Sequence, residues 1–99
     1  MSGKSTSQSS GLKAGGTNVI WVGKGTLNGV TVIGDGVNAA TVTIFDNASA
    51  TSGTVLASVF CPITAGTINV VFEAAVRCDF GIVAQVSGTG ATALVYFGA

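Results

Sequence analysis

From Thr17 onward the chain is a succession of short runs rich in β-branched residues, each bounded by glycine, asparagine, aspartate or serine. Such runs are typical of β-strands, and strands are predicted at residues 18–22, 27–33, 40–46, 54–60, 67–73, 80–86 and 92–97. Their starts recur about every 9 to 14 residues, too close for the crossovers that parallel strands need. The sequence therefore predicts an all-β fold, a small antiparallel β-sandwich of about seven strands, for which a jelly roll is one form.

Alternation along the runs predicts which side chains face the core. The expected inward stripes are Val42 and Ile44; Ile68, Val70 and Phe72; and Phe80, Ile82, Ala84 and Val86, the last opposed by Val83 and Gln85. The final run, at residues 92–97, is apolar on both faces. We therefore expect it to lie centrally between layers or at a subunit contact.

The chain is more apolar and less charged than a domain of its size requires. Of its 99 residues 47% are hydrophobic and only 8% are charged, whereas ordinary soluble domains carry about 25% charged residues. A domain of this length buries only roughly 60–65% of the surface that its unfolded chain exposes. We therefore expect contacts with copies of the chain, and with a partner, to cover the surplus apolar surface.

Composition also argues against several kinds of partner. No run approaches the ~20 uninterrupted apolar residues of a membrane-spanning helix, so no membrane contact is expected. Four basic and four acidic residues cancel, which removes the field that attracts nucleic acid. The first lysine is not followed by the apolar segment of a secretory signal, so we expect synthesis and maturation in a cytoplasm.

The start of the chain differs from the rest. Residues 1–16 hold one sizeable apolar side chain among Ser, Gly, Lys, Thr and Gln, which predicts a flexible N-terminal arm before a β-sandwich domain at residues 17–99. Such an arm is either a frayed terminus or a segment that orders on a neighbouring subunit. The lone tryptophan lies in an apolar run, where it is expected to anchor the core or an interface. The expected partner-binding residues are Lys4, Leu12, Lys13, Trp21, Leu94 and Tyr96.

The residue types that catalysis requires are scarce. The chain has no histidine, which removes the side chain best suited to acid–base chemistry and any Ser-His-Asp arrangement. Asp35 and Asp46 fall in predicted turns, where carboxylates cap backbone N–H groups. Glu73, Arg77 and Asp79 are expected to form a surface ion-pair cluster. We therefore expect no enzyme activity, no catalytic residue, no metal site and no cofactor.

Cys61 and Cys78 are expected to be free and largely buried. If the runs at residues 54–60, 67–73 and 80–86 alternate in direction, the two cysteines lie at opposite ends of the sandwich. At ~3.3 Å per residue this places them about 20 Å apart. A disulfide needs Cα atoms within ~7 Å.

Three segments resemble parts of small structural proteins from the virions of tailed bacteriophages: TVTIFDNAS at residues 41–49, RCDFGI at 77–82 and VSGTGA at 86–91. The resemblance covers about residues 17–99. It is closest to the capsid decoration, or cement, proteins. It implies a β-sandwich on the outer surface of the capsid, often a trimer, that bridges neighbouring copies of the major capsid protein and has no active-site residues.

Two other functions fit the same pattern. A tail, neck or fibre-base component of the same kind of particle would form rings or tubes instead of trimers on a shell. A carbohydrate-binding or adhesion module also fits a small sandwich, because a fold alone does not fix function. Few exposed aromatic and carboxamide clusters are expected, which counts against this last alternative.

Overall fold

The computed structural model describes residues 7–98, and within that range every regular element is a β-strand. The strands are β1 (Gln8–Ser9), β2 (Lys13–Ala14), β3 (Gly16–Val22), β4 (Gly25–Ile33), β5 (Ala40–Asp46), β6 (Thr54–Cys61), β7 (Thr67–Cys78), β8 (Gly81–Ser87) and β9 (Thr92–Gly98). Across residues 7–98 there is no helix of the length and apolarity needed to cross a membrane.

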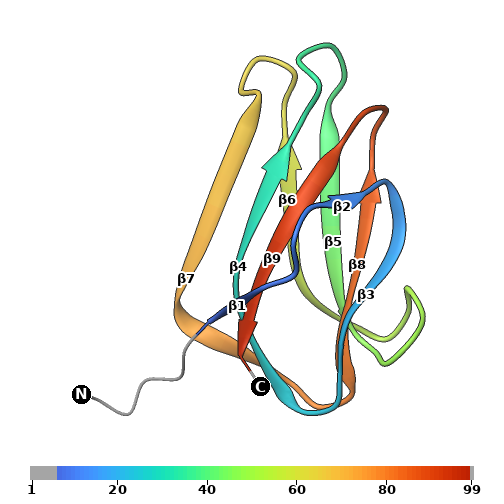
Figure 1. Cartoon of the computed structure of the whole chain (residues 1–99), viewed down its shortest axis with the longest axis vertical. Coiled ribbons are helices and arrows are strands. Elements are labelled where there is room, and N and C mark those ends of the chain that lie inside the picture. The colour runs from blue at the N-terminus through green and yellow to red at the C-terminus, as the bar shows by residue number, and fades with distance from the viewer. Residues whose placement is uncertain (1–6, 99) are drawn as a thin grey trace.

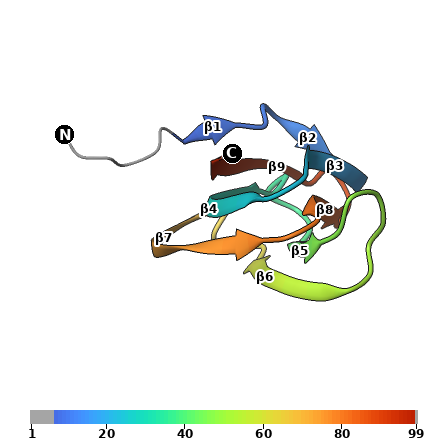
Figure 2. The ribbon, with the colours of Figure 1, turned by 90° about the horizontal axis from the view of Figure 1, so that it is seen from below.

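The strands form two antiparallel sheets that pack face to face. Sheet A has the order β1-β9-β4-β7, with β2 also pairing with β9, and sheet B has the order β3-β8-β5-β6. Figure 1 shows the whole chain, and Figure 2, seen from below, shows the two sheets as separate layers. The predicted all-β antiparallel sandwich is confirmed.

The order of the strands is that of a jelly roll. β5 pairs with β6, β4 with β7, β3 with β8 and β2 with β9, so the chain is one long hairpin folded about residues 47–53. Rolling this hairpin up adds the pairs β4 with β9 and β5 with β8, which close the two sheets. Both halves of the hairpin therefore contribute alternate strands to each sheet.

All seven predicted strands are present, with ends that differ by a few residues. The largest difference is at β7, which was predicted to end at Glu73 and continues to Cys78. The sequence pattern gave no indication of β1 and β2, which lie within the predicted arm and pair with β9 of the same chain. Part of the arm therefore belongs to sheet A in this structure.

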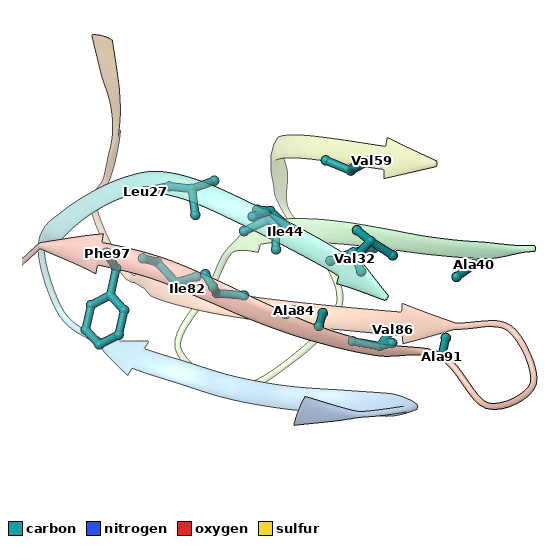
Figure 3. Packing of buried hydrophobic residues seen from close by; sticks show 14 of the residues in the cluster. Leu27, Val32, Ala40, Ile44, Val59, Ile82, Ala84, Val86, Ala91 and Phe97 are labelled. Atoms are coloured by element: carbon teal, nitrogen blue, oxygen red, sulfur yellow. The ribbon is translucent and has the colours of Figure 1, made fainter. Parts of the chain in front are cut away.

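The core lies between the sheets (Figure 3) and is made by the predicted alternation. Its largest fully buried side chains include Leu27, Val30 and Val32 from sheet A and Ile44 and Ile82 from sheet B. The apolar residues of β7 that face inward, Ile68, Val70 and Phe72, are only half-buried. The sandwich is thus fully packed at its centre and less well covered along β7.

One inward assignment was wrong. Phe80 does not continue the stripe of Ile82, Ala84 and Val86, because it precedes β8 in the turn after β7 and is 66% exposed. Its backbone N–H instead bonds to Asp46. The prediction followed the period of a strand past the point where the strand begins.

Candidate functional site

A cleft of about 470 Å³ opens on the outer face of sheet A, where β7 bends away from β4. Leu27 pairs with Val76 and Gly29 with Val71, so Asn28 alone lies opposite residues 72–75 of β7. The same Asn28 is unmatched on the other side of β4, because Leu27 pairs with Phe97 and Gly29 with Tyr96. Figure 1 shows the resulting sharp bend in β7. Bulges re-aim side chains and are common beside functional sites.

Gly29 allows the strands to approach closely at the cleft. A Cβ at this position would lie 2.8 Å from the Val70 carbonyl oxygen and 3.5 Å from Tyr96 Cδ2. Any larger residue would therefore push β7 or the tyrosine ring away. A glycine inside a strand is a sequence signal for a bulge or a close approach, and here it marks both.

The lining of the cleft is mixed in character. Its polar members are Ser7, Thr26, Asn28, Glu73 and Tyr96. Its apolar surface comes from Gly29, Val71, Phe72 and Ala75. Glu73 is the only ionisable carboxylate among these residues, and no ion pair involves it within residues 7–98. The cleft therefore offers one exposed carboxylate, several neutral polar groups and the half-buried ring of Tyr96, whereas Phe72 packs against the core.

Hydrogen bonds fix two of the polar groups. The Asn28 Nδ2 donates to Ser7 Oγ at 2.7 Å, which leaves the side-chain oxygen of Asn28, Oδ1, free to accept. The Thr31 hydroxyl donates to Asn69 Oδ1 at 2.7 Å and lies 3.5 Å from the Tyr96 hydroxyl. The Tyr96 side chain is half-buried, and its hydroxyl lies beside Thr31, which does not line the cleft. Tyr96, Thr31 and Asn69 thus form a short polar chain across β9, β4 and β7.

The outer face of sheet B carries an apolar row where that of sheet A has a cleft. Val19, Val83, Phe45 and Val55 are cross-strand neighbours and form this row over all four strands. The ladders shift register beside the row, between Val19 and Trp21 and between Ile44 and Phe45. Val83 is 0% exposed although it lies outside the core between the sheets, and its neighbours in the row are Val19 and Phe45.

Asp46 ties the end of β5 to the turn between β7 and β8. Its carboxylate accepts backbone N–H groups from Asp79, Phe80 and Gly81 at 2.8–3.3 Å. Burial raises the pKa of Asp46, but these hydrogen bonds lower it more, so the pKa lies below its ordinary value. Asp46 was expected to cap its own turn, whereas it caps a turn more than thirty residues away.

Asp35 does cap its own turn, as predicted. Its Oδ1 accepts the backbone N–H groups of Val37 and Asn38 at 2.8 and 2.7 Å. These bonds, with one from the Asn38 side chain, hold the pKa of Asp35 below its ordinary value. This aspartate has a local structural role.

The expected cluster of Glu73, Arg77 and Asp79 forms only in part. Arg77 Nε and Asp79 Oδ1 are 3.5 Å apart, and both side chains are largely exposed. Exposed pairs of this kind stabilise a fold by about 1 kcal/mol or less. Glu73 lines the cleft instead.

Both cysteines are free and buried, as predicted. Cys78 pairs with Gly25 at the start of β4, whereas the Cys61 sulfur lies beside Gly34, just after β4 ends. The two thiols are therefore at opposite ends of the sandwich. Burial, with a smaller contribution from the charge of Asp46, raises the pKa of the Cys78 thiol, which makes it a poor nucleophile.

The structure brings four of the predicted contact residues together. Leu12 and Lys13 belong to the arm segment along β9, and Lys13 pairs with Ala93. Leu94 and Tyr96 are half-buried and alternate with the inward residues of β9, on the outer face of sheet A. Leu12 is 62% exposed. Lys4 lies outside the described residues.

Trp21 is separate from that group. It is half-buried at the edge of the core, with its ring centre 5.7 Å from that of Phe97. Its indole N–H donates to the Lys24 carbonyl oxygen at 3.0 Å. These contacts give it an anchoring place between the sheets, and a role at an interface stays a prediction.

Sequence reasoning did not find the cleft. Its carboxylate, Glu73, had been assigned to an ion-pair cluster, and only Tyr96 was singled out among the lining residues. Two signals pointed to it, Gly29 inside a run of strand-forming residues and the weak strand formers Ala74 and Ala75 inside β7.

Neither metal chemistry nor likeness to known proteins assigns a function to these surfaces. Within residues 7–98, no three His, Cys, Asp or Glu side chains are grouped as a metal site would require. No family model matches the chain, and neither does any curated protein or solved structure. The shape and chemistry of the surfaces are therefore the basis for a function.

Proposed function

We propose that this chain is a non-enzymatic structural protein of a phage-type virion, a capsid decoration protein that binds the outer shell and stabilises it. It is made in the host cytoplasm and acts as a homo-oligomer, with a trimer favoured. Its partner is the major capsid protein or another virion subunit. Nucleic acid and membranes are not among its partners.

The observation that carries this proposal is the amount of apolar surface left uncovered. Within residues 7–98, nine large hydrophobic side chains are at least 46% exposed: Leu12, Val19, Val22, Val37, Val55, Phe60, Ile63, Val71 and Phe80. They are spread over the arm segment, both sheets and the connecting loops. A surface with apolar contacts on several sides fits a subunit held between neighbours better than a monomer.

Two further points support it. Jelly rolls are common in viral capsid proteins and in lectins, which is support by analogy because a fold hosts many functions. The segments at residues 41–49, 77–82 and 86–91 resemble decoration proteins. These segments include the Asp46 clamp and the turn that it holds.

The test uses bare heads of the phage whose genome encodes the chain. Added protein should bind them and raise their thermal disruption temperature, because a ligand that binds only the assembled state stabilises that state. Phe60→Ser and Val71→Ser, at side chains 60% and 72% exposed, should each weaken binding if their surfaces are used. Thr17→Ser on an exposed strand position is the matched control. Heads whose disruption temperature does not change would contradict the proposal.

Light scattering tests the oligomer separately. At micromolar concentration the purified chain should have the mass of more than one copy. A clean monomer would remove the homo-oligomer from the proposal. Immunogold labelling that marks tails or necks instead of heads would assign the protein to that part of the particle.

A further inference from the structure

The cleft on sheet A has features that a merely structural sheet does not need. It lies at the bulge of β7, where residues 72–75 face Asn28, and at the shift of β4 against both its neighbours, and it depends on the close approach that Gly29 permits. The register shifts of sheet B are smaller, since each leaves a single residue unmatched. The volume of the cleft, about 470 Å³, is within the range of small-molecule sites.

The polar groups of the cleft suit a ligand rich in hydroxyl groups. The Glu73 carboxylate and the Asn28 side-chain oxygen are acceptors, and the Thr26 hydroxyl can both donate and accept. A cationic ligand would use the carboxylate and leave the donor of Thr26 unmatched. Neighbouring sugar hydroxyls, which donate and accept in turn, satisfy all three groups.

The apolar groups of the cleft complete the match. Tyr96 is half-buried on the outer face of β9, and Phe72 and Val71 are part of the opposite wall. A sugar ring has C–H groups on its faces, which pack on an aromatic ring while its hydroxyls reach outward. Rigid aromatic side chains provide such contact at low cost in conformational entropy.

We propose that this cleft binds a saccharide. The ring of Tyr96 packs against a face of one sugar ring, and the side-chain oxygens of Glu73 and Asn28 accept hydrogen bonds from its hydroxyl groups. The bound unit is a neutral hexose or N-acetylhexosamine of a longer glycan. This inference goes beyond the proposed function, because it gives the subunit a surface for cell-surface or polysaccharide recognition. A decoration protein without this activity remains a decoration protein.

The experiment is a titration of the isolated full chain, labelled with ¹⁵N, followed by amide spectra. The probes are glucose, galactose, mannose and N-acetylglucosamine, with a printed glycan array for longer saccharides. At least one sugar should move the amide signals of Asn28, Gly29 and Glu73 in a saturating manner. For a single ring the dissociation constant should be on the order of millimolar, as ligands of this size allow. Because no heads are present, failure here does not affect the proposed function.

Variants separate a specific site from weak general adsorption. Glu73→Gln should weaken binding about tenfold or more, because it replaces a charge-assisted hydrogen bond with a neutral one. Tyr96→Ala should abolish binding, and Tyr96→Phe, which keeps the ring, should retain it within a few-fold. Gln85→Ala on the exposed face of sheet B is the control and should leave affinity unchanged.

Three results would overturn the proposal. One is the absence of saturating shifts with all four sugars and of any array signal. Another is an unchanged affinity in both Glu73→Gln and Tyr96→Ala while their spectra show a folded chain. The third is saturation of the same amides by arginine amide or lysine amide but by no sugar, which would make the cleft a site for a basic side chain.

Discussion

The two outer faces of the sandwich use the same kind of strand in opposite ways. On sheet B the apolar row crosses all four strands, and Val83 at its centre is fully buried although the ladders shift register beside the row, after Val19 and before Phe45. On sheet A, β4 shifts against both its neighbours and β7 bends away, so Tyr96 is left half-buried beside a cleft. Both sheets therefore contain bulges, but only the larger one, in β7, opens a cleft of this size within residues 7–98.

The comparison also shows how a sheet can be opened without loss of the core. The bulge at residues 72–75 lies in β7, the edge strand of sheet A. Leu27 and Val30, on either side of the register shift in β4, remain fully buried. The bulge in β7 thus leaves the core beside it fully packed. Bulges bend a strand locally and leave the rest of the ladder paired.

The largest effect should come from a charge placed at Val83, the fully buried position on the outer face of sheet B. Val83→Asp would bury an unpaired carboxylate and should lower the free energy of unfolding by about 4 kcal/mol or more. Leu94→Asp, at a half-buried position on the open face, should cost only about 1 kcal/mol. Urea denaturation of both variants measures the difference. Equal losses would mean that the two faces are not covered differently.

A side chain added at Gly29, where β4 and β7 approach closely, should have the next largest effect. Gly29→Ala forces its new Cβ toward the Val70 carbonyl oxygen and should lower the free energy of unfolding by about 2 kcal/mol. Gly15→Ala is the control, since its Cβ would make only an ordinary contact of 3.7 Å with the Val86 carbonyl oxygen. Thermal denaturation compares the two. Equal stability of both variants would show that β7 can shift without cost.

A smaller effect should come from weakening the hydrogen bonds that the Asp46 carboxylate accepts from the turn between β7 and β8. Asp46→Asn keeps the shape but removes the charge that three backbone N–H groups contact, and should cost about 1 kcal/mol at neutral pH. The folded-state pKa of Asp46 is lowered, so this contribution is present above the unfolded pKa near 4 and is lost as pH falls through the folded pKa.

The pH dependence gives a second readout of the same clamp. Between neutral pH and about pH 3, wild type should lose more stability than Asp46→Asn. Denaturation at several pH values measures this, with Asp35 unchanged in both chains as the common background. Parallel curves for the two proteins would show that Asp46 does not contribute.

The smallest effect should be at the tyrosine of the open face. Tyr96→Phe removes a hydroxyl whose neighbour is 3.5 Å away and should change the free energy of unfolding by less than about 0.5 kcal/mol. Calorimetry of the two chains tests this. A loss of several kcal/mol would mean that the polar chain through Thr31 and Asn69 supports the sheet and not the cleft.

Much of the fold was readable from the sequence because its strands are locally consistent. The runs at residues 40–46 and 92–97 are rich in strand formers and have turn residues nearby, and the structure has strands there. The inward positions of Val42 and Ile44 followed from alternation alone. The nested pairing of the strands needed the structure, since alternation does not identify a strand's partner.

The features that were missed depend on contacts between distant parts of the chain. Gln8–Ser9 and Lys13–Ala14 have no strand pattern and become strands because β9 offers an edge to pair with. Val83 is fully buried on the outer face between Val19 and Phe45, which are distant from it in sequence. Glu73 lines a cleft only because β7 bends at the alanines that follow it. Local pattern predicts none of these.

The nested hairpin also sets an order in which the chain can close. β5 and β6 are joined by residues 47–53, whereas Lys13 and Ala93, which pair between β2 and β9, are 80 positions apart in the chain. The entropy lost on closing a loop grows with its length, so pairing should spread from the β5–β6 hairpin outward. Until residues 7–14 arrive, the edge of β9 is bare, uncharged and apolar on both faces. The short arm is then the last piece to fold, and it covers the edge at which newly made chains would otherwise aggregate.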